Sequence, residues 1–229
     1  MTLSRPAMAM FSLLLPSPHS FIRNPNPSSP FSSKSPHRLP KLSSSQSPVS
    51  TVPLLPKSLL LSLISDEDRG IKTQSNPSKR AEIIQAIEDL AVLGAGTITT
   101  GPSLSATWRL LWTTEKEQLF IIKNAGLFGT AAGDVLQVID VENGLLNNVI
   151  TFPPDGVFFV RSTMDPAPPQ RVNFKFTSAV LRGSNWEIPL PPFGQGWFES
   201  VYMDDEIRVA KDIRGDYLVV DRAPYSWQE

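Results

Sequence analysis

The stretch from Trp197 to Arg222, WFESVYMDDEIRVAKDIRGDYLVVDR, decides the fold that the sequence predicts. It holds three short runs of alternating apolar and polar residues, separated by the acidic break Asp204-Asp205 and by a polar turn that contains Gly215. Glycine readily adopts the positive φ that such a turn needs. Strands joined by short turns form hairpins, so the stretch predicts the last three strands of an antiparallel sheet.

The middle run of this stretch has a clear division of faces. Successive side chains of a strand point to opposite sides of the sheet, which places Ile207 and Val209 on one face. Glu206 and Arg208 fall on the other face.

More strands are expected upstream, because the apolar period changes to two after residue 102. Trp108, Leu110 and Trp112 are expected to share one face of the first of them, and Asn143-Gly144 is a strong hairpin signal. The expected strands are residues 106–113, 118–122, 134–141, 145–152, 157–163 and 171–181. With the last three they make nine or ten, which predicts an antiparallel sandwich or barrel. A barrel has no free edge and can hold a small ligand.

Two helices are expected before the strands. Residues 54–64, LLPKSLLLSLI, predict a short buried helix. Asn76-Pro77 has the form of an N-cap followed by proline at the first helical position, and the helix that follows is expected to end near Gly94. We expect its apolar face to pack on the sheet. Docking on a membrane surface is the alternative, which the mostly acidic polar face disfavours.

The first 65 residues differ from the rest in charge. They hold six of the 21 basic residues and none of the 22 acidic residues, which leaves residues 66–229 with 15 basic against 22 acidic residues, a net charge of −7. Residues 16–56 are rich in Ser and Pro, which disfavours helix and sheet. We predict that residues 1–53 are a plastid transit peptide and that residues 54–229 form one domain. A plain disordered tail is the alternative.

Several kinds of chemistry are missing from the predicted domain. The chain has no cysteine, and both histidines, His19 and His37, precede it, which removes thiolate catalysis and the Ser-His-Asp triad. No cofactor or metal site is expected. The acidic turn at residues 204–206 could bind a cation, but a solvated turn is the simpler interpretation. The negative charge disfavours nucleic-acid binding. A hydrolase or isomerase that uses carboxylates is a third alternative, and we expect no enzyme.

Four segments together resemble the plastid lipid-associated protein family, also called plant fibrillins. They are SLLLSLISDEDRG, ATWRLLWTTE, GDVLQVIDVENGLLNNVITF and the opening stretch at residues 197–222, and the likeness covers roughly residues 55–222. Two positions depart from the family pattern. Ala106 stands where the family has Gly, and Lys211 stands where Arg is usual, which would lose a bidentate contact.

The resemblance implies a mostly β, lipocalin-like antiparallel barrel with one or two N-terminal helices. It also implies import into the plastid and association with thylakoids or plastoglobules as a peripheral lipid protein. The ligands it implies are small lipophilic molecules such as prenylquinones, carotenoids or fatty acids. The matching candidate ligand-binding residues are Asp204, Arg208, Trp108 and Arg222.

Two hypotheses follow for the interior and for partners. We expect Trp108 to close one end of the barrel with Arg208 or Arg222 over its ring, or else to be an ordinary core residue. The alternative function is a non-catalytic module that supports a plastid isoprenoid or prenylquinone enzyme. Its basis is the run of aromatic residues between Pro and Gly in residues 191–198, which has the character of an exposed loop. Packing of this loop over one end of the barrel is the simpler interpretation.

Overall fold

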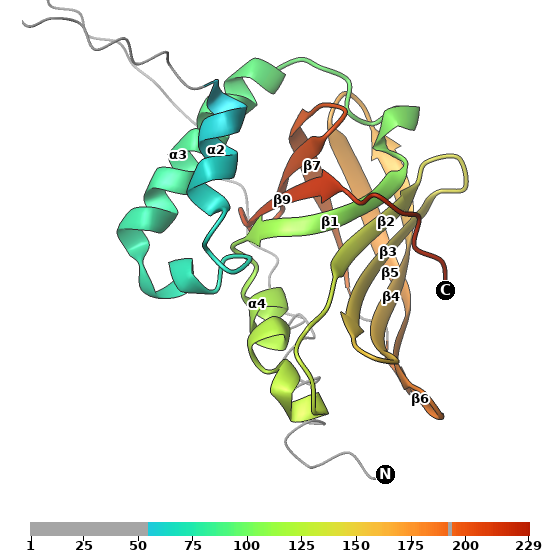
Figure 1. Ribbon diagram of the computed structural model, residues 1–229. Coiled ribbons are helices and arrows are strands. Elements are labelled where there is room, and N and C mark those ends of the chain that lie inside the picture. Colours follow the sequence, from blue (N-terminus) through green and yellow to red (C-terminus); the bar gives the residue numbers. More distant parts are fainter. Residues whose placement is uncertain (1–54, 192–193) are drawn as a thin grey trace, which may run out of the picture. The chain divides into compact units, whose positions relative to one another are not determined.

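The computed structural model describes residues 55–191 and 194–229 (Figure 1). The predicted transit peptide, residues 1–53, lies outside the described residues and stays a prediction. The α-helices are α2 (Pro56–Ile64), α3 (Pro77–Gly94) and α4 (Lys116–Lys123), and the 3₁₀ helices are η1 (Lys72–Ser75), η2 (Pro102–Leu104) and η3 (Ala125–Phe128). In the described part of the chain, no helix has the length and apolarity to cross a membrane.

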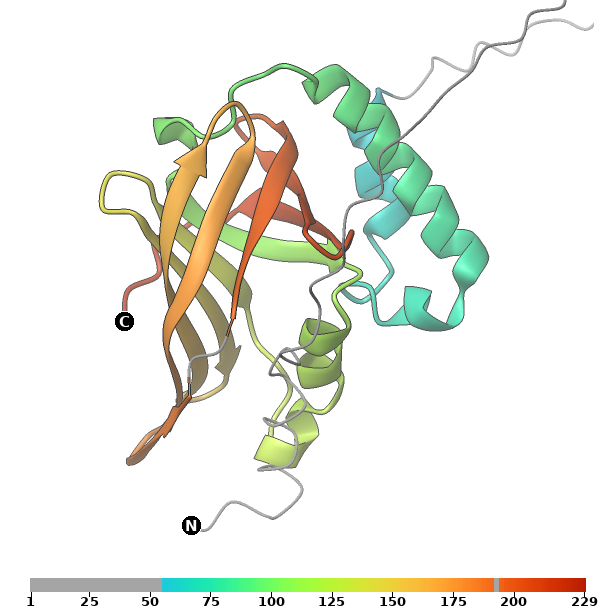
Figure 2. The ribbon, with the colours of Figure 1, turned by 180° about the vertical axis from the view of Figure 1, so that it is seen from behind.

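Nine antiparallel strands make up most of the fold, so the predicted mostly β antiparallel architecture is confirmed. They are β1 (Ala106–Thr113), β2 (Val135–Asp140), β3 (Leu145–Phe152), β4 (Gly156–Ala167), β5 (Arg171–Gly183), β6 (Trp186–Leu190), β7 (Gln195–Met203), β8 (Ile207–Asp212) and β9 (Tyr217–Arg222). Their order is β4-β3-β2-β1-β9-β8-β7-β5, and β5 pairs again with β4. These eight strands therefore form a closed series of pairings, called here the strand ring, and β6 extends from β5 as a hairpin (Figures 1 and 2).

Both predicted N-terminal helices are present and pack on the outside of the strand ring, but α2 is not the buried helix that was predicted, because only its Leu60 and Ile64 are buried. The Asn76 side chain accepts a hydrogen bond from the backbone N–H of Lys79 at 3.1 Å, which is the expected N-cap. The buried residues of α2 and α3 form one apolar cluster with residues of β1, β8 and β9, among them Trp112, Val209 and Val219. The two helices lie side by side against these strands (Figure 1).

The strands β8 and β9 are buried on both faces. Val209 of β8 packs in the cluster with the helices and Ile207 is buried, whereas Arg208 and Ala210 face the inside of the strand ring. On β9 the interior positions alternate with the helix-facing ones in the same way. The polar face predicted for the middle run is thus an interior face, and this two-sided burial makes the segment from Trp197 to Arg222 central to the fold.

The segment 118–122 is a helix, so the predicted strand there is wrong. Residues 116–123 form α4, with Leu119, Ile121 and Ile122 buried. A short apolar run fits a buried strand and a helix equally well. The pairing decides the outcome, because β1 already has β2 on one side and β9 on the other, which leaves no edge for the next segment.

The expectation for β1 is also corrected at Trp112. Its pairing with β9 shifts between Leu110 and Trp112, which is the mark of a β-bulge. A bulge adds a residue to one strand and changes which face the following side chains occupy. Trp108 and Leu110 accordingly lie in the interior cluster, while Trp112 lies in the cluster under α2 and α3.

Gly94 sets how closely α3 approaches β7. A Cβ atom at this position would lie 2.1 Å from the backbone oxygen of Val201, so any side chain would push the helix away. At Gly101, by contrast, a Cβ atom would meet nothing within 4 Å, and its φ of −82° suits any residue.

We predict that Gly94→Ala lowers the stability of the domain by about 1–3 kcal/mol, the usual cost of overpacking. Thermal unfolding followed by circular dichroism measures it, with Gly101→Ala as the matched control, which should change stability by less than about 0.5 kcal/mol. Equal midpoints for the two variants would contradict this role of Gly94.

Candidate ligand-binding site

The interior of the strand ring holds a cluster of two arginines and one tryptophan. Trp108 is fully buried on β1, and its indole N–H donates to the backbone oxygen of Leu104 at 2.9 Å. Arg222 on β9 is the pairing partner of Trp108, and its guanidinium carbon lies 4.5 Å from the centre of the indole ring. The guanidinium carbon of Arg208 on β8 lies 5.2 Å from the same ring. The predicted stacking is thus present for both arginines.

Arg208 carries a positive charge into the interior with few partners. Its side chain is fully buried, and its Nη2 group donates to the side-chain oxygen of Gln137. The Nε and Nη1 groups have no hydrogen-bond partner among the described residues. The guanidinium also lies 5.3 Å from the ring of Phe198. Burial lowers the pKa of Arg208 to about 9, and the like charge of Arg222 acts in the same direction.

Such a group is expensive to keep inside a protein. A buried charge without a paired counter-charge costs several kcal/mol, and each buried donor without an acceptor adds to this cost. Cation–π contact with an indole returns about 0.5–2 kcal/mol. The described residues therefore leave Arg208 short of hydrogen-bond acceptors.

A cavity of about 130 Å³, called here the inner cavity, lies next to this cluster. Gln137, the acceptor for Arg208, lines it, whereas Arg208 itself is not part of the lining. One wall is aromatic: the ring centres of Phe174 and Phe176 are 5.3 Å apart, and those of Phe174 and Phe198 are 6.4 Å apart. Leu146 and Leu218 add apolar surface, and the amide of Gln137 donates to Asn148 at 3.1 Å.

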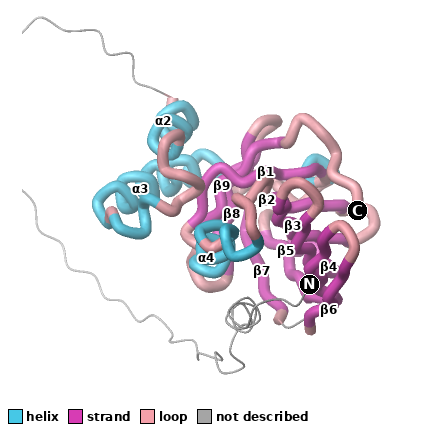
Figure 3. The backbone as a smooth tube through the Cα atoms, turned by 60° about the horizontal axis from the view of Figure 1, so that its bottom comes forward, coloured by secondary structure: helices cyan, strands magenta, loops and turns pink. Residues whose placement is uncertain are grey.

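Part of the lining of the inner cavity, called here its polar mouth, is polar and comes from Glu115, Gln118, Asp212, Arg214 and Asp216. Gln118 belongs to α4, the helix that comes to the front in Figure 3. Glu115, just before α4, accepts a hydrogen bond from the Gln118 amide at 2.6 Å. Burial raises the pKa of Glu115 to about 7, and the negative charge of Asp212 adds to this while Arg214 opposes it. Arg214 is itself bound to Glu117 at 2.8 Å and to Asp212 at 3.2 Å.

Asp204 is not part of this cluster. It lies in the β7–β8 turn, where its carboxylate accepts the backbone N–H groups of Glu206 and Ile207, each at 2.8 Å. Lys57 of α2 lies 2.7 Å away and the Tyr202 hydroxyl donates at 3.0 Å. Burial opposes ionisation, but the hydrogen bond from Ile207 and the contact with Lys57 outweigh it and lower the pKa of Asp204 to about 2.

Asp204 therefore fastens α2 to the turn between β7 and β8, and its predicted ligand contact stays a prediction. Lys57 also contacts Glu206, at 2.5 Å, so the acidic turn is ion-paired. No group of three or more acidic or histidine residues suited to a metal occurs among the described residues.

The second half of the aromatic segment predicted as an exposed loop is strand, because β7 begins at Gln195. Trp197 and Phe198 belong to β7, and Phe198 is buried in the interior. The guanidinium of Arg171 lies 4.0 Å from the centre of the Trp197 ring. Pro192 and Phe193 lie outside the described residues, so the prediction of a partner contact there is not tested.

Sequence reasoning missed Gln137 and Glu115. Gln137 is a polar residue at an inward position of β2, between Val135 and Ile139, and that interruption of an apolar face is the signal that could have found it. Glu115 had no such signal, because the strand expected at 118–122 hid the helix that brings it to the cavity.

Comparison with known proteins gives the family. The sequence profile of the family described as PAP_fibrillin matches residues 55–221. The chain belongs to the PAP/fibrillin family. It is 76% identical over 173 residues to the "Probable plastid-lipid-associated protein 11, chloroplastic" of Arabidopsis thaliana, covering 76% of this chain and 82% of that protein. No solved structure gives a significant match. The family match spans α2 and the strands as far as Asp221, so it includes Trp108, Arg208 and the inner cavity and ends one residue before Arg222.

We predict that the stability of this PAP/fibrillin domain depends on pH through Glu115. The folded pKa of about 7 lies above the ordinary 4.5, so the folded state holds a proton that the unfolded state has lost between these values. The stability that this proton supports is present below about pH 4.5 and is lost as pH rises through about 7. Glu115→Gln should therefore gain about 2–3 kcal/mol over the natural protein between about pH 5 and about pH 8.

Thermal melts at the two pH values measure this difference. Glu117→Gln is the control, since it removes the same charge two residues away, from an ion pair at the surface. A Glu115→Gln difference that stays constant between the two pH values would show that Glu115 does not carry the effect.

Proposed function

We propose that this protein is a non-enzymatic plastid protein that binds a small lipophilic molecule inside the strand ring. The family match and the name of the Arabidopsis relative support the plastid and the lipid association. The observation that carries the ligand site is Arg208, a fully buried guanidinium with two unpartnered N–H groups, next to a cavity with an aromatic wall.

The class of ligand follows from what Arg208 lacks. A molecule with a hydrogen-bond acceptor supplies the partners that the Nε and Nη1 groups lack, and it reaches them from the inner cavity once the Gln137 side chain moves aside. A quinone carbonyl or a fatty-acid carboxylate does this, whereas a carotene without oxygen leaves the N–H groups unpaired. Hydrogen bonds to a charged group contribute about 1.5–3 kcal/mol. The proposed ligand is therefore a prenylquinone or a fatty acid, with its polar end toward Arg208.

The size of the inner cavity limits how much of the ligand enters. Small-molecule sites usually enclose about 300–1,000 Å³, and a cavity of about 150 Å³ holds a benzene ring. The 130 Å³ here therefore suits a single ring or a carboxylate with a few methylene groups. The rest of the molecule leaves through the polar mouth.

An exposed apolar end of the helices supports peripheral contact with a thylakoid or plastoglobule surface. Leu55 before α2 and Val92 and Leu93 at the end of α3 are 74%, 75% and 61% exposed. The start of α2 and the end of α3 lie at the same end of the helix pair (Figure 1). Apolar side chains at one end of a helix pair can insert between lipid head groups without a spanning segment.

The test is retention of ligand by the full-length protein. The protein is incubated with a prenylquinone or a long-chain fatty acid, purified again and extracted with organic solvent for mass spectrometry. We predict stoichiometric ligand on the natural protein and at least about tenfold less on Arg208→Met, because the charged hydrogen bonds are lost. The melting temperature of Arg208→Met should not fall, since an apolar side chain replaces an unpaired buried charge.

Arg171→Met is the matched control, because Arg171 also stacks on a tryptophan but at an exposed site. It should retain ligand like the natural protein. An empty natural protein, or equal retention by Arg208→Met, would overturn the proposed site.

A further inference from the structure

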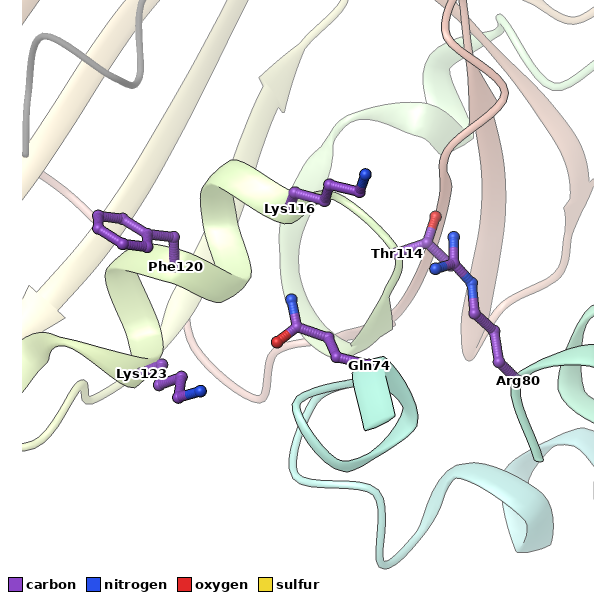
Figure 4. A pocket seen from close by; sticks show the side chains of 6 residues that line it. All are labelled: Gln74, Arg80, Thr114, Lys116, Phe120 and Lys123. Carbon is purple, nitrogen blue, oxygen red and sulfur yellow. The ribbon is translucent and has the colours of Figure 1, made fainter. Parts of the chain in front are cut away.

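A second concave site lies outside the strand ring, between η1, the start of α3 and α4. It encloses about 320 Å³, more than twice the inner cavity. Its lining comes from three separate elements and from the residue that follows β1, as Figure 4 shows. We call it the basic groove; it is lined by Gln74, Arg80, Thr114, Lys116, Phe120 and Lys123.

The charges of the basic groove are unusual for this domain. Four Lys and Arg side chains in the described residues make no hydrogen bond or ion pair with another described residue, and they are Arg80, Lys116, Lys123 and Lys175. Three of these four line this one groove. Residues 66–229 have a net charge of −7, so acidic side chains outnumber basic ones in this part of the chain. Against that composition, a groove lined by three unpaired cations and no carboxylate is unusual.

The carboxylate that Thr114 contacts, Asp216, already has partners. The Thr114 hydroxyl donates to Asp216 at 2.8 Å, and Asp216 lies 3.7 Å from Arg214. Thr114 also accepts the backbone N–H of Tyr217, so it forms a fixed wall of the groove. The positive charge of Arg80, Lys116 and Lys123 is thus left for a group from outside the domain.

The side of α4 that meets the groove is amphipathic. Residues 116, 120 and 123 follow the i, i+4, i+7 spacing of one helix side. Phe120, which is 38% exposed, therefore lies between two exposed lysines. Across the groove stand the amide of Gln74 and the guanidinium of Arg80 (Figure 4). Cations around an exposed aromatic ring suit an oxyanion that is attached to an apolar body.

We propose that the basic groove binds a phosphate- or sulfate-type oxyanion, with Arg80, Lys116 and Lys123 as its cationic ligands and Gln74 as a further donor. Guanidinium and ammonium groups are the usual partners of such oxyanions. Phe120 favours the head group of an anionic lipid as the source over a free anion. The site is separate from the interior cluster and does not depend on the ligand proposed there.

The experiment compares two double variants in the full-length protein. Lys116→Gln with Lys123→Gln removes two charges from the groove. Lys175→Gln with Arg182→Gln removes two charges from β5 and is the matched control. The basic residues that precede Asp66 are the same in all proteins, so they cannot cause a difference between the variants. The melting temperature of each variant is measured first and should equal that of the natural protein.

One arm measures co-sedimentation with phosphatidylcholine vesicles that contain phosphatidylglycerol, against vesicles of phosphatidylcholine alone. The other arm follows amide NMR shifts of residues 74–80 and 114–123 on addition of inorganic phosphate. A cationic side chain near an anionic surface gives about a fivefold gain in binding, so the groove variant should bind the anionic vesicles at least about tenfold more weakly. The β5 control should bind them like the natural protein.

Each outcome decides the proposal. Loss confined to the groove variant supports it, with a lipid head group as the source if only vesicles bind. Phosphate-dependent shifts that the groove variant abolishes support it with a soluble oxyanion as the source. Equal loss of binding in both double variants would show that the effect depends only on net charge and would overturn the proposed site. Absence of binding in both arms would overturn it as well.

Discussion

The buried guanidinium of Arg208, 5.2 Å from the ring of Trp108 and 5.3 Å from that of Phe198, is the constraint on which the candidate binding site depends. Two neighbouring strands partly compensate the cost of burying this charge: β1 supplies the indole ring and β2 supplies Gln137. That compensation is incomplete, since two N–H groups stay unpartnered. Interiors rarely keep such groups without a function. The unpaired donors beside an aromatic cavity are what turn a packed core into a candidate binding site.

The architecture around this charge follows from strands that are buried on both faces. β8 and β9 have the interior on one side and the helix pair α2–α3 on the other. Their side chains are therefore buried on both faces, unlike those of a strand with one face in solvent. Asp204 and Lys57 fasten the helix pair at the β7–β8 turn, and Gly94 lets α3 approach the backbone of β7. These contacts hold β8 in place, and with it the position of Arg208. The bulge in β1 allows one strand to give Trp108 to the interior and Trp112 to the helix interface.

Much of this could be predicted from the sequence, because hairpin turns and period-two alternation are local signals. The three C-terminal strands, β1, β3 and the N-cap at Asn76 fall where the residues indicated. Stacking of Arg208 or Arg222 on Trp108 was expected, and the structure places both arginines near its ring. The helix at 116–123 was not predictable in the same way, since only the pairing of β1 on both sides excludes a strand there. The separation of Asp204 from the arginines depends on its turn hydrogen bonds, and the basic groove depends on tertiary packing of three elements. Neither leaves a period or a motif in the sequence.

The side-chain Nε–H resonance of Arg208 reports most directly on the central claim, that the buried guanidinium binds the polar end of a lipophilic ligand. It is assigned in the full-length protein by its loss in Arg208→Met and followed during titration with a prenylquinone or a long-chain fatty acid. The account predicts that this resonance shifts and exchanges its proton more slowly as ligand is added, because an unpartnered donor gains an acceptor. A resonance that stays unchanged while the ligand binds would place the ligand elsewhere and make Arg208 a purely structural residue.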